Sequence, residues 1–63
     1  LDDVRTIARD ARDWLRSGGW LVMEIGYQQG EAVKALLERF GYADVAIAND
    51  LTGRPRIAEG RNP

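Results

Sequence analysis

The residues best suited to chemistry form a short polar segment directly after an apolar stretch. Glu24, Tyr27, Gln28 and Gln29 follow the apolar residues 20–23. A carboxylate in an apolar strand is costly to bury unless something pairs with it or donates hydrogen bonds to it. A Gln side chain can both donate and accept hydrogen bonds beside an amide or a cofactor. Glu24, Gln28 and Gln29 are therefore candidate substrate-pocket residues.

Each of these residues also has a structural interpretation, which stays open. Glu24 could accept hydrogen bonds from backbone N–H groups at the start of the next helix, or pair with an arginine. Gln28 and Gln29 could be solvated residues before that helix. The glycines Gly26 and Gly30 are not expected to bind phosphate, because their spacing lacks the Lys-Ser/Thr of a P-loop and the tight first turn of the dinucleotide fingerprint.

Composition excludes several classes of site and partner. The 63 residues contain no Cys and no His, which excludes the common zinc sites and a Ser/His or Cys/His nucleophile, so no catalytic or metal-binding residue is assigned. Nine basic against ten acidic residues give a net charge of -1, and no basic patch indicates nucleic-acid binding. No apolar run approaches the ~20 residues of a membrane span. The absence of cysteine fits a cytoplasmic protein.

Residues 2–16 are predicted to form an amphipathic helix. Asp2 and Asp3 are favourable at its N-terminus, where the helix dipole is positive. Residues 17–19, Ser-Gly-Gly, can end the helix, because glycine adopts the left-handed backbone conformation of a helix C-terminus. Its apolar positions recur at helical spacing. They are Val4, Ile7, Ala8, Ala11, Trp14 and Leu15.

Three strands and a second helix are predicted to follow. Residues 20–25 lack alternation, which indicates a strand covered on both faces, as in a parallel sheet. Residues 31–40 read as a second helix, ended by Gly41. Residues 45–48 alternate in the direction of their side chains, which fits a second strand. Residues 51–55 are predicted to form a turn, and residues 56–60 a weak third strand. The residues expected in the core are Trp14, Val33, Leu36, Leu37 and Phe40.

The order of these elements predicts an α/β fold. Helix, strand, helix, strand, strand contains one βαβ unit, and the last strand should run antiparallel, near one edge of a mixed sheet that looks like half of an open doubly wound sheet. Both helices should pack on the same face, with Val4, Ile7, Ala11 and Trp14 against the sheet. Ligands of such sheets bind outside the carboxyl ends of the strands, here residues 24–30.

Residues 15–33, L-R-S-G-G-W-L-V-M-E-I-G-Y-Q-Q-G-E-A-V, resemble a stretch of the HemK-type protein-(glutamine-N5) methyltransferases, L-K-P-G-G-x-L-x-x-E-I-G-x-x-Q-G-E-A-V. Residues 41–45 and 49–54 continue with the family's G-F-x-D-V and D-L-A-G-R patterns. The resemblance covers essentially the whole chain. Pro55 and Glu59 depart from the usual apolar ending, which puts the packing of the last strand in doubt.

The resemblance implies the C-terminal part of a class I, Rossmann-like methyltransferase fold, with S-adenosyl-L-methionine as cofactor and a peptide chain release factor as partner. Residues 1–63 would then be a C-terminal fragment of the catalytic domain, which agrees with a first residue of Leu1 instead of Met. The family's Asn-Pro-Pro-Tyr loop holds the acceptor amide, and its cofactor loop is rich in glycine. Neither is present, since Asn62-Pro63 lacks the second Pro and the Tyr.

No catalytic or cofactor-binding residue is therefore carried over from the family, and the fragment alone is expected to be inactive. Only residues 24–29 match family positions near the mouth of the cleft, and the resemblance thereby adds Tyr27 to Glu24, Gln28 and Gln29 as a candidate residue on the substrate side of the pocket. Two other functions stay open: a class I methyltransferase that acts on RNA or on a small molecule, and a small α/β interaction module without catalysis.

Overall fold

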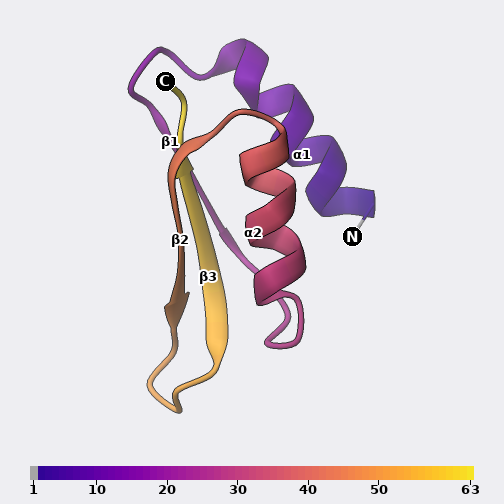
Figure 1. Ribbon diagram of the computed structural model, residues 1–63, viewed down its shortest axis with the longest axis vertical. Helices are drawn as coiled ribbons and strands as arrows, with labels where there is room; N and C mark the ends of the chain where they lie inside the picture. Colours follow the sequence, from indigo (N-terminus) through magenta and orange to yellow (C-terminus); the bar gives the residue numbers. More distant parts are fainter. Residues whose placement is uncertain (1) are drawn as a thin grey trace.

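The computed structural model describes residues 2–63, which form two helices and three strands (Figure 1). The elements are α1 (Asp2–Trp14), β1 (Trp20–Glu24), α2 (Gly30–Arg39), β2 (Ala43–Asn49) and β3 (Pro55–Arg61). The predicted α/β class and the order helix, strand, helix, strand, strand are confirmed. No helix within residues 2–63 combines the length and the apolar character needed to cross a membrane.

The strands form a sheet in the order β1-β3-β2, in which β3 runs antiparallel to both neighbours. The predicted reversal of β3 is confirmed, but its predicted place near one edge is wrong, because it is the central strand. β1 and β2 point the same way and are separated by β3. In this position β3 can hydrogen-bond along both of its sides, which pairs more backbone groups than an edge position would.

Both helices lie on the same face of the sheet, as predicted (Figure 1). One hydrophobic cluster joins them to the strands, and Val33 and Leu37 of α2 are its largest fully buried side chains. The buried members of the cluster are Ala8, Ala11, Leu21, Ile25, Val33, Leu37, Tyr42 and Ala58.

The buried stripe of α1 is narrower than predicted. Ala8 and Ala11 are buried, and Val4 and Leu15 pack against the cluster. Trp14 is 69% exposed and Ile7 is also exposed, so the predictions that both contact the sheet and that Trp14 belongs to the core are wrong. At 100° per residue these two side chains lie to one side of the stripe that faces the cluster.

The other face of the sheet carries no element among residues 2–63. Trp20, Val22 and Ile57 on this face are exposed, so within the described chain β1 is covered on one face and not, as predicted, on two. The doubt about the last strand is also resolved. Pro55 is the first residue of β3, where a missing N–H is tolerated, and Glu59 lies opposite Val22 on the uncovered face.

Helix α2 ends at the glycine expected from the sequence. Gly41 has a φ of 92°, and its N–H donates to the carbonyl of Glu38. The N–H of Tyr42 donates to the carbonyl of Leu37, which completes a Schellman motif. As a result of this turn, the Tyr42 side chain lies in the core, directly before the first residue of β2.

The end of the sheet at which β1 begins and β3 ends is closed by buried polar contacts. The Tyr42 hydroxyl donates to the carbonyl of Ala8 over 2.7 Å. The Asn62 side chain, which is buried, donates to two carbonyls of the turn directly after α1, at 2.7 Å from Leu15 and 3.2 Å from Arg16. We call these two residues and their partners the closed end. They fasten α1 to the sheet.

Candidate functional site

The opposite end of the sheet brings together three chain segments. β1 and β2 finish there and β3 starts there, so the loop after β1 lies beside the β2–β3 hairpin (Figure 1). We call residues 24–29 and 50–56 together the open edge. It is the side on which open α/β sheets bind ligands. The four candidate residues from the sequence all lie on this edge.

Glu24 is exposed at the last position of β1, opposite Ile57 of β3. Within residues 2–63 its carboxylate therefore avoids the cost of burial, because Glu24 lies on the uncovered face of the sheet. Among residues 2–63 its carboxylate takes part in no hydrogen bond or ion pair, so neither of its two structural interpretations is observed there. Glu24 is a charged group directed away from the core.

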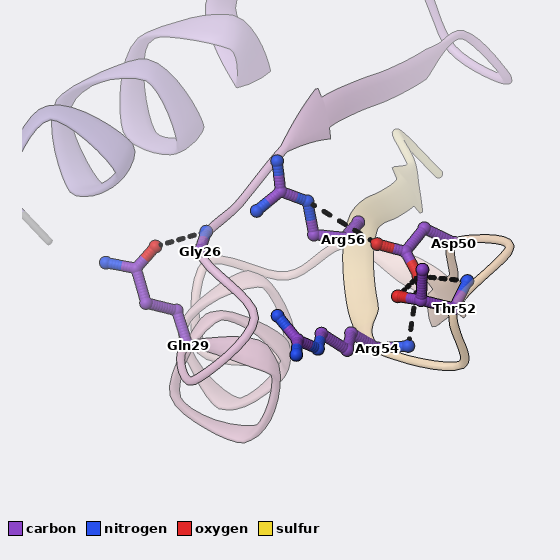
Figure 2. Close-up of polar contacts among 6 residues, drawn as sticks. All are labelled: Gly26, Gln29, Asp50, Thr52, Arg54 and Arg56. Carbon is purple, nitrogen blue, oxygen red and sulfur yellow. Dashed lines mark hydrogen bonds and ion pairs between the residues drawn. The ribbon is translucent and has the colours of Figure 1, made fainter.

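Gln29 shapes the loop from within. Its Oε1 accepts a hydrogen bond of 2.8 Å from the N–H of Gly26, and its own N–H donates to the Gly26 carbonyl over 2.9 Å (Figure 2). Gln28 donates from Nε2 to the Tyr27 hydroxyl over 3.1 Å. Tyr27 and Gln28 are exposed, so their polar groups are accessible to a partner molecule.

The hairpin contributes residues that the sequence analysis did not select. Asp50 Oδ1 accepts hydrogen bonds from the Thr52 hydroxyl, the Thr52 N–H and the Arg54 N–H, at 2.6, 2.8 and 3.1 Å (Figure 2). The bond from the Thr52 hydroxyl is the main cause that lowers the pKa of Asp50 below its ordinary value, and the Arg54 N–H adds to it. The turn is thus ordered around an ionised carboxylate.

Two arginines extend from this turn toward the loop after β1 (Figure 2). The Arg54 guanidinium lies over the Tyr27 ring, 5.0 Å from its centroid. Arg56 Nε is 3.9 Å from Asp50 Oδ2, a loose and partly exposed ion pair. The signal that could have found them is topological: any turn between β2 and a returning strand must lie on the same edge as the end of β1.

The loop offers no cradle for a cofactor. A Cβ on Gly26 would come 3.1 Å from Gln29 Oε1, and a Cβ on Gly30 would come 3.2 Å from the Pro55 Cβ, so the space beside both glycines is filled by this chain. Within residues 2–63 there is also no cluster of three potential metal ligands. Asn62 serves the closed end, far along the sheet from the open edge. The described residues do not fit a methyl-donor site.

No family model matches the chain, but curated proteins match it from end to end. It is 49% identical over 63 residues to the release factor glutamine methyltransferase of Cereibacter sphaeroides and 46% identical over 63 residues to that of Xylella fastidiosa strain 9a5c. It is 46% identical over 61 residues to that of Salmonella typhimurium. The chain is similar to a C-terminal segment of release factor glutamine methyltransferases.

The resemblance stated from the sequence is thereby confirmed. The match covers 100% of this chain but only about 23% of the length of these relatives. Neither alternative function, a methyltransferase for RNA or small molecules or a module without catalysis, is favoured by these similarities.

Proposed function

We propose that this chain is the C-terminal part of the catalytic domain of a release factor glutamine methyltransferase. The longer protein would transfer a methyl group from S-adenosyl-L-methionine to the side-chain amide of a glutamine in a peptide chain release factor. The observation that carries the proposal is the identity of 37–49%, over 97–100% of the chain, to proteins named release factor glutamine methyltransferase. A cytoplasmic location remains a prediction from the sequence.

The architecture supports a larger Rossmann-like fold around this chain. The uncovered face of the sheet exposes the apolar side chains of Trp20, Val22 and Ile57 beside two glutamates, and β1 has one side free of partners among residues 2–63. A doubly wound sheet would continue from that side and carry helices on the uncovered face. The exposed Trp14 and Ile7 on α1 offer a further apolar surface for such a neighbour.

In this proposal the open edge lies at the acceptor side of the enzyme. An amide nitrogen is a poor nucleophile because its lone pair is delocalised, so catalysis depends mainly on positioning and on directed polar groups. Glu24, Tyr27, Gln28 and Gln29 would border the acceptor pocket without touching the reacting atoms. The methyl-donor site and the groups that hold the amide would come from the rest of the longer protein.

The test is to produce the complete protein that contains this chain, incubate it with S-adenosyl-L-methionine and a purified release factor, and map methylation by peptide mass spectrometry. We expect one added methyl group on a single glutamine of the release factor. Replacing that glutamine with asparagine should abolish the signal. Methylation of RNA in the same preparation, with none on the release factor, would overturn the proposal in favour of the alternative acceptor class.

A further inference from the structure

Three consecutive residues at the base of the hairpin hold the loop after β1 at three points. The Arg56 carbonyl accepts a hydrogen bond of 2.8 Å from the N–H of Ile25. Pro55 fills the space beside Gly30, where a Cβ would come within 3.2 Å of its own Cβ. The Arg54 guanidinium covers the Tyr27 ring. The hairpin therefore holds the Ile25 end of the loop by a backbone hydrogen bond and the Gly30 end by packing of the Pro55 ring, and it contacts the middle of the loop through the Arg54–Tyr27 pair.

The Arg54–Tyr27 contact depends on the order of the turn behind it. Asp50 accepts a hydrogen bond from the Arg54 N–H over 3.1 Å, and the Arg54 carbonyl accepts one of 2.8 Å from the Asp50 N–H. These bonds fix the backbone from which the Arg54 side chain extends. Because no carboxylate among residues 2–63 pairs with the Arg54 guanidinium, the aromatic ring is its observed partner there.

We propose that the Arg54–Tyr27 pair is a positioning contact for the protein substrate: it fixes the middle of the 26–29 loop, where Tyr27 and Gln28 present exposed polar groups to the segment carrying the acceptor glutamine. This inference rests on the proposed function. A substrate segment recognised here would be an extended loop rich in backbone and amide groups, because the loop offers a hydroxyl and an amide and not a strong charge field. The methyl donor, bound elsewhere, is unaffected by the pair.

The experiment is a double-mutant cycle in the complete enzyme with Arg54→Ala, Tyr27→Leu and the combined variant. Steady-state KM and kcat are measured for the release factor, and KM for S-adenosyl-L-methionine. We expect each single variant to raise KM for the release factor about two- to fivefold, the size of a partly exposed cation–π contact, and the combined variant to raise it no further. KM for the methyl donor and the melting temperature should not change.

Matched variants separate the contact from charge and from polarity. Tyr27→Phe keeps the ring that Arg54 covers and removes only the hydroxyl, so it should raise KM for the release factor less than Tyr27→Leu does. Arg54→Lys keeps the charge but not the planar guanidinium, so its KM should lie between those of the unmodified enzyme and Arg54→Ala. Arg39→Ala removes one exposed positive charge at the far end of α2 and should leave KM unchanged. Additive effects in the cycle, an equal effect of Arg39→Ala, or an equal rise in KM for the methyl donor would overturn this inference while the proposed function stands. Absence of release-factor methylation by the unmodified enzyme would overturn both.

Discussion

The two ends of the sheet use polar residues in opposite ways. At the closed end, Tyr42 and Asn62 are buried and each donates to a backbone carbonyl of α1 or of the turn after it. At the open edge, Glu24, Tyr27 and Gln28 are exposed, and their hydrogen-bonding capacity is largely unused within residues 2–63. Buried polar groups that are satisfied stabilise a fold, whereas accessible unsatisfied ones are available to a partner. The difference indicates a structural role for the closed end, and it is the reason why we propose recognition at the open edge.

The cause of this difference is the position of the helices. α1 and the turn after it lie beside the closed end, so the Tyr42 hydroxyl reaches a carbonyl of α1 and the Asn62 amide reaches carbonyls of that turn. Burial raises the pKa of the Tyr42 hydroxyl, and the nearby Arg12 guanidinium lowers it in part. Only the first turn of α2 approaches the open edge, where its Gly30 packs against Pro55 of β3. The polar side chains there are left accessible on the outer side.

The largest effect expected is complete: the isolated 63-residue chain should not bind S-adenosyl-L-methionine and should not methylate a release factor. Gln29 and Pro55 fill the space beside the two glycines of the loop after β1, so the chain could enclose little of the surface of S-adenosyl-L-methionine. Isothermal titration calorimetry on the chain, with the complete protein as the positive control, checks this. Micromolar binding by the chain alone would mean that the open edge is a complete site and not a border of one.

Next in size is the loss of the Tyr42 side chain at the closed end. Tyr42→Ala should lower the free energy of unfolding of the complete protein by about 3 to 5 kcal/mol, because it removes a buried aromatic group and leaves a cavity. Tyr42→Phe keeps the ring and loses the bond to Ala8, so it should cost only about 0.5 to 1.5 kcal/mol. Urea denaturation measures both. Equal losses for the two variants would show that the hydroxyl, and not the packing, dominates.

Asn62 should follow with a smaller effect. Asn62→Ala leaves the carbonyls of Leu15 and Arg16 without this donor and should cost about 1 to 3 kcal/mol. Asn62→Asp should cost at least as much at neutral pH, since a carboxylate cannot donate to carbonyls. Pro63→Ala is the matched control, because Pro63 is exposed and should stay within about 0.5 kcal/mol of the unmodified protein. A stable Asn62→Asp variant would contradict the role given to this side chain.

The smallest effect concerns Asp50 in the hairpin and depends on pH. Because the folded pKa lies below the ordinary value of 3.8, the Asp50 carboxylate contributes stability above that value and loses it as the pH falls through the lowered pKa. The unmodified protein should therefore be more stable than Asp50→Asn at neutral pH, and the difference should vanish in acid. Thermal unfolding across this range measures it. A difference that persists in acid would show that charge is not the cause.

Much of the fold could be predicted from local patterns. The glycines after both helices, the apolar run of residues 20–23 and the alternation of residues 45–48 each set one element, because these signals depend on neighbours in the sequence. The place of β3 between β1 and β2 could not be predicted, since a strand after a tight turn can pair on either side of its predecessor. The predicted burial of Trp14 was wrong because helical spacing identifies a stripe of apolar residues but does not show which part of that stripe contacts the core.

The sequence predicted the part of the candidate site that follows β1 but not the part in the β2–β3 hairpin. Glu24 and the residues after it were selected because a carboxylate interrupts an apolar run, a signal within one segment. Arg54 and Arg56 lie far along the chain in a turn of ordinary composition, and their relation to Tyr27 exists only after the strands are ordered. The roles of Glu24, Tyr27, Gln28 and Gln29 stay predictions.

The most direct test of the contrast between the two ends is to measure melting temperature and methyl transfer to a release factor in the same preparations of Glu24→Gln, Gln29→Ala and Asn62→Ala. We expect the two open-edge variants to lose about tenfold in kcat, less than the ~10²-fold that a 1 Å misplacement can cost, with stability changed by less than about 1 kcal/mol. Asn62→Ala should lose stability and keep its turnover at temperatures where it is folded. If Glu24→Gln and Gln29→Ala keep full activity, the open edge is not the acceptor side and the account is contradicted.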